Sequence, residues 1–205
     1  MTHLLDAIKH RRSIRKYQSY PVPDKLVLEI LAAAGSAPSA HNAQPWRFIV
    51  LADASVKQKL ADAMAEAWAV DLARDGLTVE AEKRAERVER FADAPIVIVA
   101  CLTMYGFREF PDEQRQKSER DLAVQSLGAA LQNLLLAANA LGLGACWFSA
   151  PGFCKQTVRR VLQIPVAVEP EALVTMGYPG ELPLAPAKKD LGEYCFLDVW
   201  GRAFG

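Results

Sequence analysis

Residues 121–141 limit how this chain can fold more than any other stretch, because they are apolar almost all the way round a helix. A helix at the surface of a globular domain carries its apolar side chains on one stripe, and this segment does not. A transmembrane span is the alternative, but Gln125, Gln132, Asn133 and Asn139 interrupt the run, and no other segment is comparable. We therefore expect a buried helix at the centre of the domain or along a subunit interface.

The rest of the chain alternates between helical and strand patterns. Residues 94–102 form a continuous, largely β-branched run, which is typical of a strand buried on both faces. No repeat or linker divides the chain, so we expect a single α/β or α+β domain over residues 1–205, with a mixed sheet. Helices are predicted over residues 2–9, 26–35 (with Asp24 as N-cap), 55–73, 80–91, 121–141 and 153–162, strands over 46–51, 94–102, 145–149, 171–176 and 194–200, a loop or lid over 103–120, and a tail over 181–205.

The balance of charge argues against some classes of function. The chain has 24 Lys and Arg residues and 24 Asp and Glu residues, so no global basic field exists to bind nucleic acid. The histidines, at positions 3, 10 and 41, lack the spacing of metal ligands, so we expect no metal. The N-terminus lacks the pattern of a secretory signal, and the four cysteines are scattered. We therefore expect a cytoplasmic protein with reduced thiols that binds neither nucleic acid nor membrane.

A compact basic cluster follows the first predicted helix and contains Arg11, Arg12, Ser13 and Arg15. Several cationic donors and a hydroxyl within one short stretch are the groups that a phosphate monoester needs. The alternative is a solvated helix end, because cations near a helix C-terminus are favourable and common. By itself the cluster does not decide between the two.

A second segment, about two dozen residues further on, reads PSAHNAQPWRF over residues 38–48. Its Ser, Asn and Gln side chains can pair with the edge of a heterocycle, on a loop bent by two prolines. An ordinary turn followed by a strand is the alternative for the first three residues alone. Together with the basic cluster, the segment indicates a site that holds a phosphate at one end and a flat, hydrogen-bonding ring at the other.

At these two segments the sequence resembles the nitroreductase family of FMN-dependent oxidoreductases, and the resemblance extends to about residue 197. In that family the basic stretch reaches the FMN phosphate and the pyrimidine side of the flavin. The resemblance implies that Arg15 lies near N1 and O2 of the flavin, where a cation favours the reduced ring. It places Arg11, Arg12 and Ser13 nearer the phosphate and the ribityl chain.

The resemblance also assigns the second segment to the flavin. Pro38, Ser39 and Ala40 would contact the ring, Asn42 would hydrogen-bond it across a dimer interface, and Gln44 would help to orient the chain. His41 would line the pocket or remain an exposed loop residue.

Three further groups follow from the resemblance. Ser149, Ala150 and Pro151 would lie on one face of the isoalloxazine ring, although this chain lacks the Glu-Gly pair that some members carry there. Lys188 and Lys189 would close on the phosphate, or they are solvated lysines, since Lys-Lys-Asp-Leu stands in place of the usual Lys-x-Arg. The aromatic residues of the loop or lid would select the electron acceptor: Tyr105, Phe107 and Phe110.

The implied protein is a domain-entwined homodimer of α+β fold, with a central mixed sheet flanked by helices and FMN between the subunits. NAD(P)H would reduce FMN, and a nitroaromatic, quinone or related electrophile would then take its place, in a ping-pong reaction. The flavin carries this chemistry, so no catalytic residue is assigned to the chain. Alternatives are another flavin enzyme on the same scaffold, such as a dehalogenase or a flavin-cleaving or deazaflavin-related enzyme, and a flavin-binding module without catalysis.

Overall fold

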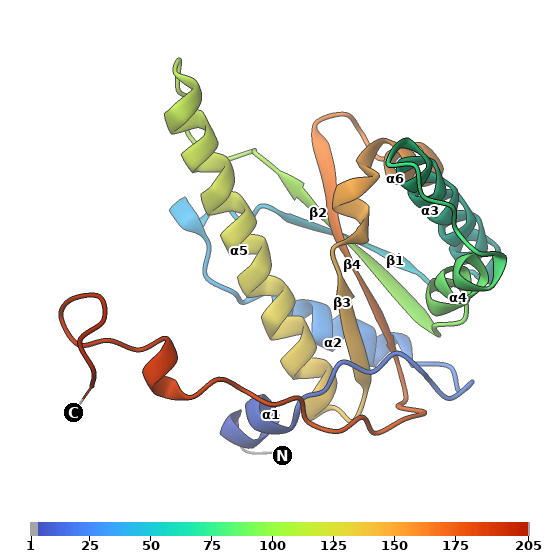
Figure 1. The fold of residues 1–205 in the computed structure, drawn as a ribbon, viewed down its shortest axis with the longest axis horizontal. Helices are drawn as coiled ribbons and strands as arrows, with labels where there is room; N and C mark the ends of the chain where they lie inside the picture. The colour runs from blue at the N-terminus through green and yellow to red at the C-terminus, as the bar shows by residue number, and fades with distance from the viewer. Residues whose placement is uncertain (1–3, 205) are drawn as a thin grey trace.

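The computed structural model describes residues 4–204. The first two positions of the helix predicted over residues 2–9, and the histidine at position 3, lie outside the described residues. A four-stranded sheet forms the centre, with helices on both faces (Figure 1). The elements are α1 (Leu4–His10), α2 (Asp24–Gly35), η1 (Ala40–Asn42), β1 (Trp46–Leu51), α3 (Ala54–Arg74), α4 (Ala81–Ala92), β2 (Ile96–Thr103), α5 (Glu113–Ala140), β3 (Gly144–Phe148), η2 (Ala150–Phe153), α6 (Lys155–Leu162), β4 (Val168–Gly177) and η3 (Leu191–Glu193).

The strands lie in the order β1-β2-β4-β3, and each neighbouring pair is antiparallel. The α+β class is confirmed, but the prediction of a mixed sheet was wrong for these four strands. Alternating helices and strands predict layers, whereas strand direction depends on the end of the sheet to which each connection returns. Among the described residues, parallel pairing occurs at an isolated bridge between Ser13 and Ala145, outside the ladders that join the four strands.

Strand β2 is buried on both faces, as its continuous apolar run predicts. Ile98 and Ala100 point into a core formed with α2 and α5, and Val97 and Val99 point into a second core formed with α3, α4 and α6. Figure 1 shows the same division, with α2 and α5 on one side of the sheet and α3, α4 and α6 on the other. The sheet therefore separates two hydrophobic cores.

Helix α5 begins at Glu113, so the prediction of a loop over residues 103–120 was wrong in its second half. Asp112 caps the helix by accepting a hydrogen bond from the backbone N–H of Arg115 at 2.9 Å. The first turns project beyond the sheet (Figure 1), so they bury no apolar stripe and their sequence is charged. Further along, α5 packs on α2 and the sheet, while Leu122 and Val124 are each 37% exposed. None of the helices described between residues 4 and 204 has the length and apolar character to cross a membrane.

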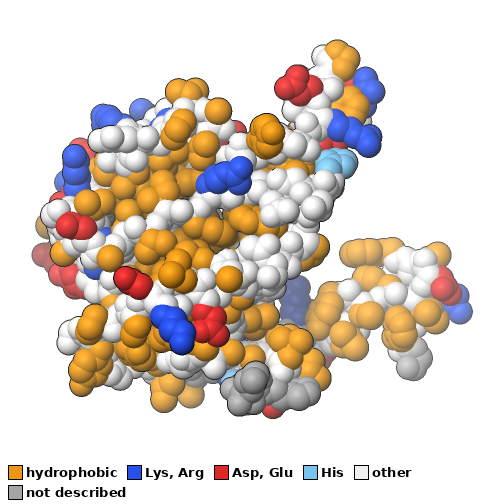
Figure 2. Space-filling model, turned by 180° about the vertical axis from the view of Figure 1, so that it is seen from behind, with side chains coloured by type: hydrophobic (Ala, Val, Ile, Leu, Met, Phe, Trp, Pro, Cys, Tyr) orange, Lys and Arg blue, Asp and Glu red, His pale blue; other side chains and the backbone are white. Residues whose placement is uncertain are grey.

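Three local predictions also need correction. Pro23 occupies the N-cap position of α2 and Asp24 begins the helix, without a side-chain capping bond. Residues 153–162 divide into a 3-10 turn and α6, because the backbone of Cys154 leaves the helical region. Residues 194–200 form turns rather than a strand, on an arm that leaves the domain after β4 (Figure 1). Hydrophobic side chains gather on this arm (Figure 2), and Trp200 is 89% exposed.

Candidate functional site

The basic segment lies along the free edge of strand β3. The backbone N–H of Ile14 donates to the carbonyl of Ala145 over 3.1 Å, and Ser13 bridges to the same residue. Gly144 permits this approach, since a Cβ atom there would lie 2.7 Å from the Cβ of Ile14. The hydroxyl of Tyr17 lies 2.5 Å from the carbonyl oxygen of Ile14 and 2.7 Å from the Thr175 hydroxyl, and burial raises the Tyr17 pKa. The segment is therefore held on the sheet edge by backbone and side-chain bonds.

The charges of this edge converge on the buried thiol of Cys146. Burial raises the pKa of Cys146, and Arg15, the Ser13 hydroxyl, Arg90 and Arg11 act on it in the opposite direction. Arg90 belongs to α4, where the sequence predicts a helix over residues 80–91 without indicating a role in the site. No periodic signal marks it, because its role depends on how α4 packs beside β3.

The guanidinium groups at this edge are not engaged by carboxylates. Among residues 4–204, none of Arg11, Arg12, Arg15 and Arg90 takes part in an ion pair. Arg12 donates to the carbonyls of Lys9 and Arg11 at 2.9 Å, and Arg15 donates to that of Ser13 at 3.4 Å. The carboxylate of Glu181 accepts from the backbone N–H of Arg15 at 2.8 Å, and Glu86, Glu89 and Asp93 line the same cavity as Arg15 and Arg90. The guanidinium groups themselves form no ion pair with these carboxylates, so they can still bind an anion.

Ser149, Ala150 and Pro151 follow β3 directly, at the other end of the same strand. The rise of a strand places Ser149 about 13 Å from Ala145, where the basic segment is attached. Ser149 borders an apolar cavity of about 360 Å³ whose walls include Gly128 and Trp147. The β3 edge thus carries a cationic group at one end and a turn beside an apolar cavity at the other.

The loop over residues 38–44 has an unusual backbone. His41, Asn42 and Gln44 have φ values of 56°, 51° and 46°, in the left-handed region that side chains other than glycine seldom adopt. Such residues persist only where surrounding contacts enforce them. Here Ser126 Oγ accepts from the N–H of Ala40 at 3.1 Å, and Ser39 Oγ accepts from the N–H of Gln44 at 3.0 Å. The loop is therefore built to present its side chains in one arrangement.

Helix α5 separates this loop from the β3 edge within one chain. Ser126 contacts Ala40, whereas a Cβ atom on Gly128 would lie 3.8 Å from the ring of Trp147. Positions two residues apart on a helix point about 200° apart, so the loop and the β3 turn lie on opposite sides of α5. The structure thus groups Arg11, Ser13, Arg15 and the 149–151 turn along one strand, and places residues 38–44 elsewhere.

The predicted acceptor residues differ in their surroundings. Tyr105 is 80% exposed, and Phe110 lies under the guanidinium of Arg115, 4.6 Å from the ring centroid. Phe107 meets the ring of His41 edge to face, with centroids 5.9 Å apart. His41 and Phe107 are therefore brought together, on the same side of α5 as the 38–44 loop.

Lys188 and Lys189 are exposed on the arm, where the structure describes no ion pair for either. Between residues 4 and 204, no group of three His, Cys, Asp or Glu side chains is arranged to hold a metal ion.

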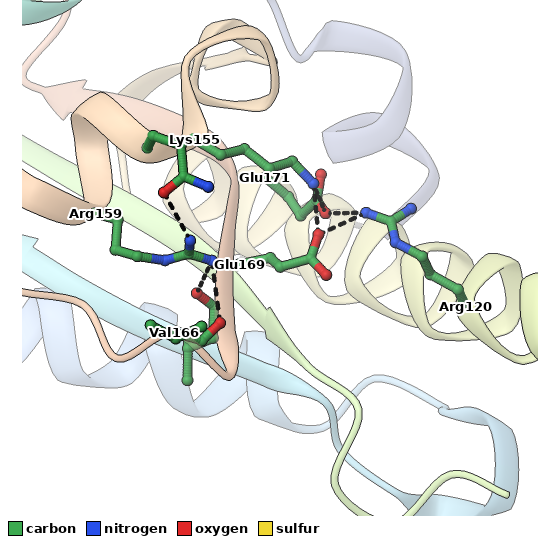
Figure 3. Close-up of polar contacts among 8 residues, drawn as sticks. Arg120, Lys155, Arg159, Val166, Glu169 and Glu171 are labelled. Atoms are coloured by element: carbon green, nitrogen blue, oxygen red, sulfur yellow. Dashed lines mark hydrogen bonds and ion pairs between the residues drawn. The ribbon is translucent and has the colours of Figure 1, made fainter. Parts of the chain in front are cut away.

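The structure contains a salt-bridge network that sequence patterns did not indicate (Figure 3). Through Glu171 it borders the apolar cavity. Arg120 of α5 and Lys155 of α6 approach Glu169 and Glu171 of β4 from opposite sides, with N–O distances of 2.6 to 2.9 Å. Burial acts to raise the pKa of Glu169, but the bonds from Lys155 and Arg120 outweigh it and lower the pKa to about 2. The network joins α5, α6 and β4 beside the turn at 149–151.

Comparisons with known proteins identify the family. The model of the Nitroreductase family matches residues 8–178, and the chain belongs to that family. An NADH dehydrogenase of Thermus thermophilus is 36% identical over 184 residues, which cover 83% of this chain and 84% of that protein.

Solved structures confirm the nitroreductase fold. A BluB-like flavoprotein from Clostridium difficile 630 superposes with a TM-score of 0.82 and 27% identity, over 97% of this chain and all of that one. An NADPH:FMN oxidoreductase from Vibrio harveyi, in complex with NAD⁺, superposes with a TM-score of 0.73 over 98% of this chain and 79% of that one. At 19% identity, the second likeness concerns the fold alone.

Proposed function

We propose that this protein is an FMN-dependent oxidoreductase that uses NAD(P)H to reduce nitroaromatics, quinones or related electrophiles by a ping-pong mechanism. The observation that carries the proposal is the β3 edge. Arginines without ion pairs among the described residues lie at one end of it, and a backbone turn beside an apolar cavity lies at the other. Membership of the nitroreductase family and a relative named as an NADH dehydrogenase support it.

The donor groups on this edge fit FMN. Arg11, Arg12 and Ser13 would hold the phosphate, because guanidinium and hydroxyl groups match its oxygens. Arg15 and Arg90, which both act on the Cys146 thiol, would lie against the pyrimidine side of the ring. When bound, FMN supplies the hydride-transfer chemistry. The arginines would favour the negative charge of the reduced ring, and the 149–151 turn would support one of its faces.

A complete site would require two chains. Residues 38–44 lie across α5 from the β3 edge of their own chain, so they would serve the site of a second copy. The C-terminal arm, with exposed Leu182, Leu184 and Trp200, carries apolar surface that a partner can cover (Figure 2). We therefore propose an entwined homodimer with Asn42 and Gln44 reaching the flavin of the partner. The same arm would bring Lys188 and Lys189 to a phosphate.

The assembly can be tested by mixing two defective variants. Arg15→Ala removes a group of the β3 edge, and Asn42→Ala removes a group of the 38–44 loop. If each site takes one segment from each chain, random reassembly of the two variants restores about a quarter of the wild-type sites. If one chain supplied both segments, every mixed site would remain defective and no activity would return.

The reaction itself is tested by an absorbance spectrum of the purified protein, followed by anaerobic titration with NADPH and NADH. Flavin bands that bleach on titration support the proposal and identify the donor. Flavin bands that never bleach indicate a flavin-binding module without reductase activity. A protein that binds no FMN after reconstitution contradicts the proposed site.

A second candidate is a different flavin enzyme on the same scaffold, for which the likeness to a BluB-like flavoprotein is the specific observation. Oxygen-dependent loss of FMN during turnover would favour a flavin-cleaving reaction. Release of halide from a halogenated aromatic would favour a dehalogenase. Rapid NAD(P)H oxidation with quinones and nitroaromatics, with FMN retained, favours the reductase.

A cytoplasmic location with free thiols remains part of the proposal, since the four cysteines are unpaired in the described chain.

A further inference from the structure

Glu119 is a buried carboxylate that joins two loops on one side of α5. Its residue is 6% exposed, and its Oε2 atom accepts from Nε2 of His41 at 3.2 Å and from the backbone N–H of Arg108 at 3.2 Å. His41 belongs to the 38–44 loop, and Arg108 belongs to the loop between β2 and α5. One oxygen atom therefore holds both loops.

The two loops also contact each other directly. A Cβ atom on Gly106 would lie 3.2 Å from the Cβ of Ala43, and the φ of +86° at Gly106 is one that glycine adopts readily. Phe107 packs edge to face on His41, and its backbone N–H donates to Met104 at 3.1 Å. The contacts on Glu119, Ala43 and His41 thus make a single wall from the two loops.

Among residues 4–204, the carboxylate of Glu119 bonds only to the two loops. Arg120, its neighbour in sequence, is engaged with Glu169 and Glu171 instead (Figure 3). Among the described residues, His41 is the one ionisable side chain that lies within ion-pair distance of Glu119. Burying a carboxylate is unfavourable unless it is hydrogen-bonded. Glu119 therefore needs the bonds from both loops to be stable at this buried position.

We propose that Glu119 is a positioning residue that fixes the loop over residues 104–110 against His41 and thereby sets the width of the acceptor pocket. The part of this proposal that concerns the acceptor rests on the proposed function. Tyr105, which is exposed, stands in sequence between Met104 and Gly106, which accept from Phe107 and pack on Ala43 respectively. Releasing Glu119 would let this ring and Phe107 move, so wide and narrow acceptors would no longer be distinguished.

Limited proteolysis tests the positioning without any flavin chemistry. Trypsin cleaves after Arg108 when the loop opens, and the rate follows the population of the open form. We expect Glu119→Ala to accelerate this cleavage about tenfold in the full chain, because two hydrogen bonds to a charged group are lost. Glu113→Ala removes an exposed carboxylate from the same helix and should leave the rate unchanged. Equal cleavage of wild type and Glu119→Ala would overturn the proposal.

Two further variants guard against a folding defect. Glu119→Gln keeps the shape of the side chain, and we expect faster cleavage at Arg108 with an unchanged circular dichroism spectrum. His41→Leu removes the ring donor and should accelerate cleavage, whereas His41→Gln retains a donor and should restore part of the protection. Acceleration that is the same in His41→Leu and His41→Gln would contradict a role for the Glu119 bond.

Kinetics test the acceptor pocket separately. We expect Glu119→Gln to change the ratio of KM values for 1,4-benzoquinone and a two-ring naphthoquinone several-fold, with an unchanged rate of anaerobic FMN reduction by NAD(P)H. An unchanged KM ratio in a variant whose loop opens would overturn the claim about acceptor width. Absence of turnover by the wild type with both quinones would instead contradict the proposed function, while the proteolysis result would still decide the positioning role.

Discussion

Ser126 Oγ accepts a hydrogen bond from the backbone N–H of Ala40 over 3.1 Å while it donates to the carbonyl of Leu122 over 2.7 Å. The hydroxyl therefore links a buried position of α5 to a loop in which three residues have positive φ. Because such a backbone is unfavourable by itself, the link helps to determine where the side chains of the loop point.

Replacing Ser126 with alanine should release this loop. We expect a loss of about 1 kcal/mol in the free energy of unfolding, which is typical of one hydrogen bond, and weaker FMN binding. Ser118→Ala is the matched control, since Ser118 Oγ donates to the Gln114 carbonyl at 3.0 Å on the same helix. Urea denaturation and titration of apoprotein with FMN measure the two effects. Equal FMN affinity in both variants would show that the loop holds its conformation without Ser126.

Gly144→Ala should displace the basic segment from the β3 edge. The new Cβ would lie 2.7 to 2.8 Å from three side-chain atoms of Ile14, and overpacking of this kind costs about 2 kcal/mol. We therefore expect lower stability together with reduced FMN affinity, measured by thermal denaturation and flavin fluorescence. Gly35→Ala is the control, because nothing lies within 4 Å of a Cβ at that position. Retention of full FMN affinity by Gly144→Ala would contradict the placement of the phosphate site.

Arg90→Gln tests the residue that the sequence analysis did not single out. Loss of a cation beside Arg15 should weaken FMN binding roughly tenfold and shift the flavin reduction potential to a more negative value. Arg84→Gln, on the same helix, breaks only an exposed pair with Glu66 and should change neither quantity. A reduction potential that is equal in Arg90→Gln and wild type would exclude Arg90 from the pyrimidine side of the ring.

Local patterns were sufficient to predict the layers of the fold. The run at residues 94–102 correctly indicated a strand buried on both faces, and the apolar residues from Ala123 to Ala138 indicated a long buried helix. The start of that helix was missed because Glu113 and the residues after it project beyond the sheet and bury no apolar stripe. Strand direction was missed because it depends on connections between distant elements.

In the site, too, local motifs could be predicted from the sequence, whereas contacts between distant elements could not. The cationic segment and the 38–44 loop were recognisable as short motifs, but no local signal could show that α5 stands between them. Arg90 and Glu119 lie in charged helical stretches where many carboxylates and cations are simply solvated. Arg90 lines the same cavity as Arg15, 75 residues away in sequence, and Glu119 bonds to His41, 78 residues away. Only the folded chain brings these residues together.

The network around Glu169 predicts a dependence of stability on pH. Its pKa is lowered from the usual value of 4.5 to about 2, so the folded state favours the charged carboxylate. This contribution is fully present above about pH 4.5 and is lost as the pH falls toward 2. Glu169→Gln should therefore unfold at a lower urea concentration than wild type at pH 7, and the difference should shrink as the pH falls below 4.5. Glu82→Gln, at an exposed site without a described ion pair, is the control. A difference for Glu169→Gln that stays constant between pH 7 and pH 3 would show that Lys155 and Arg120 do not stabilise the charged form.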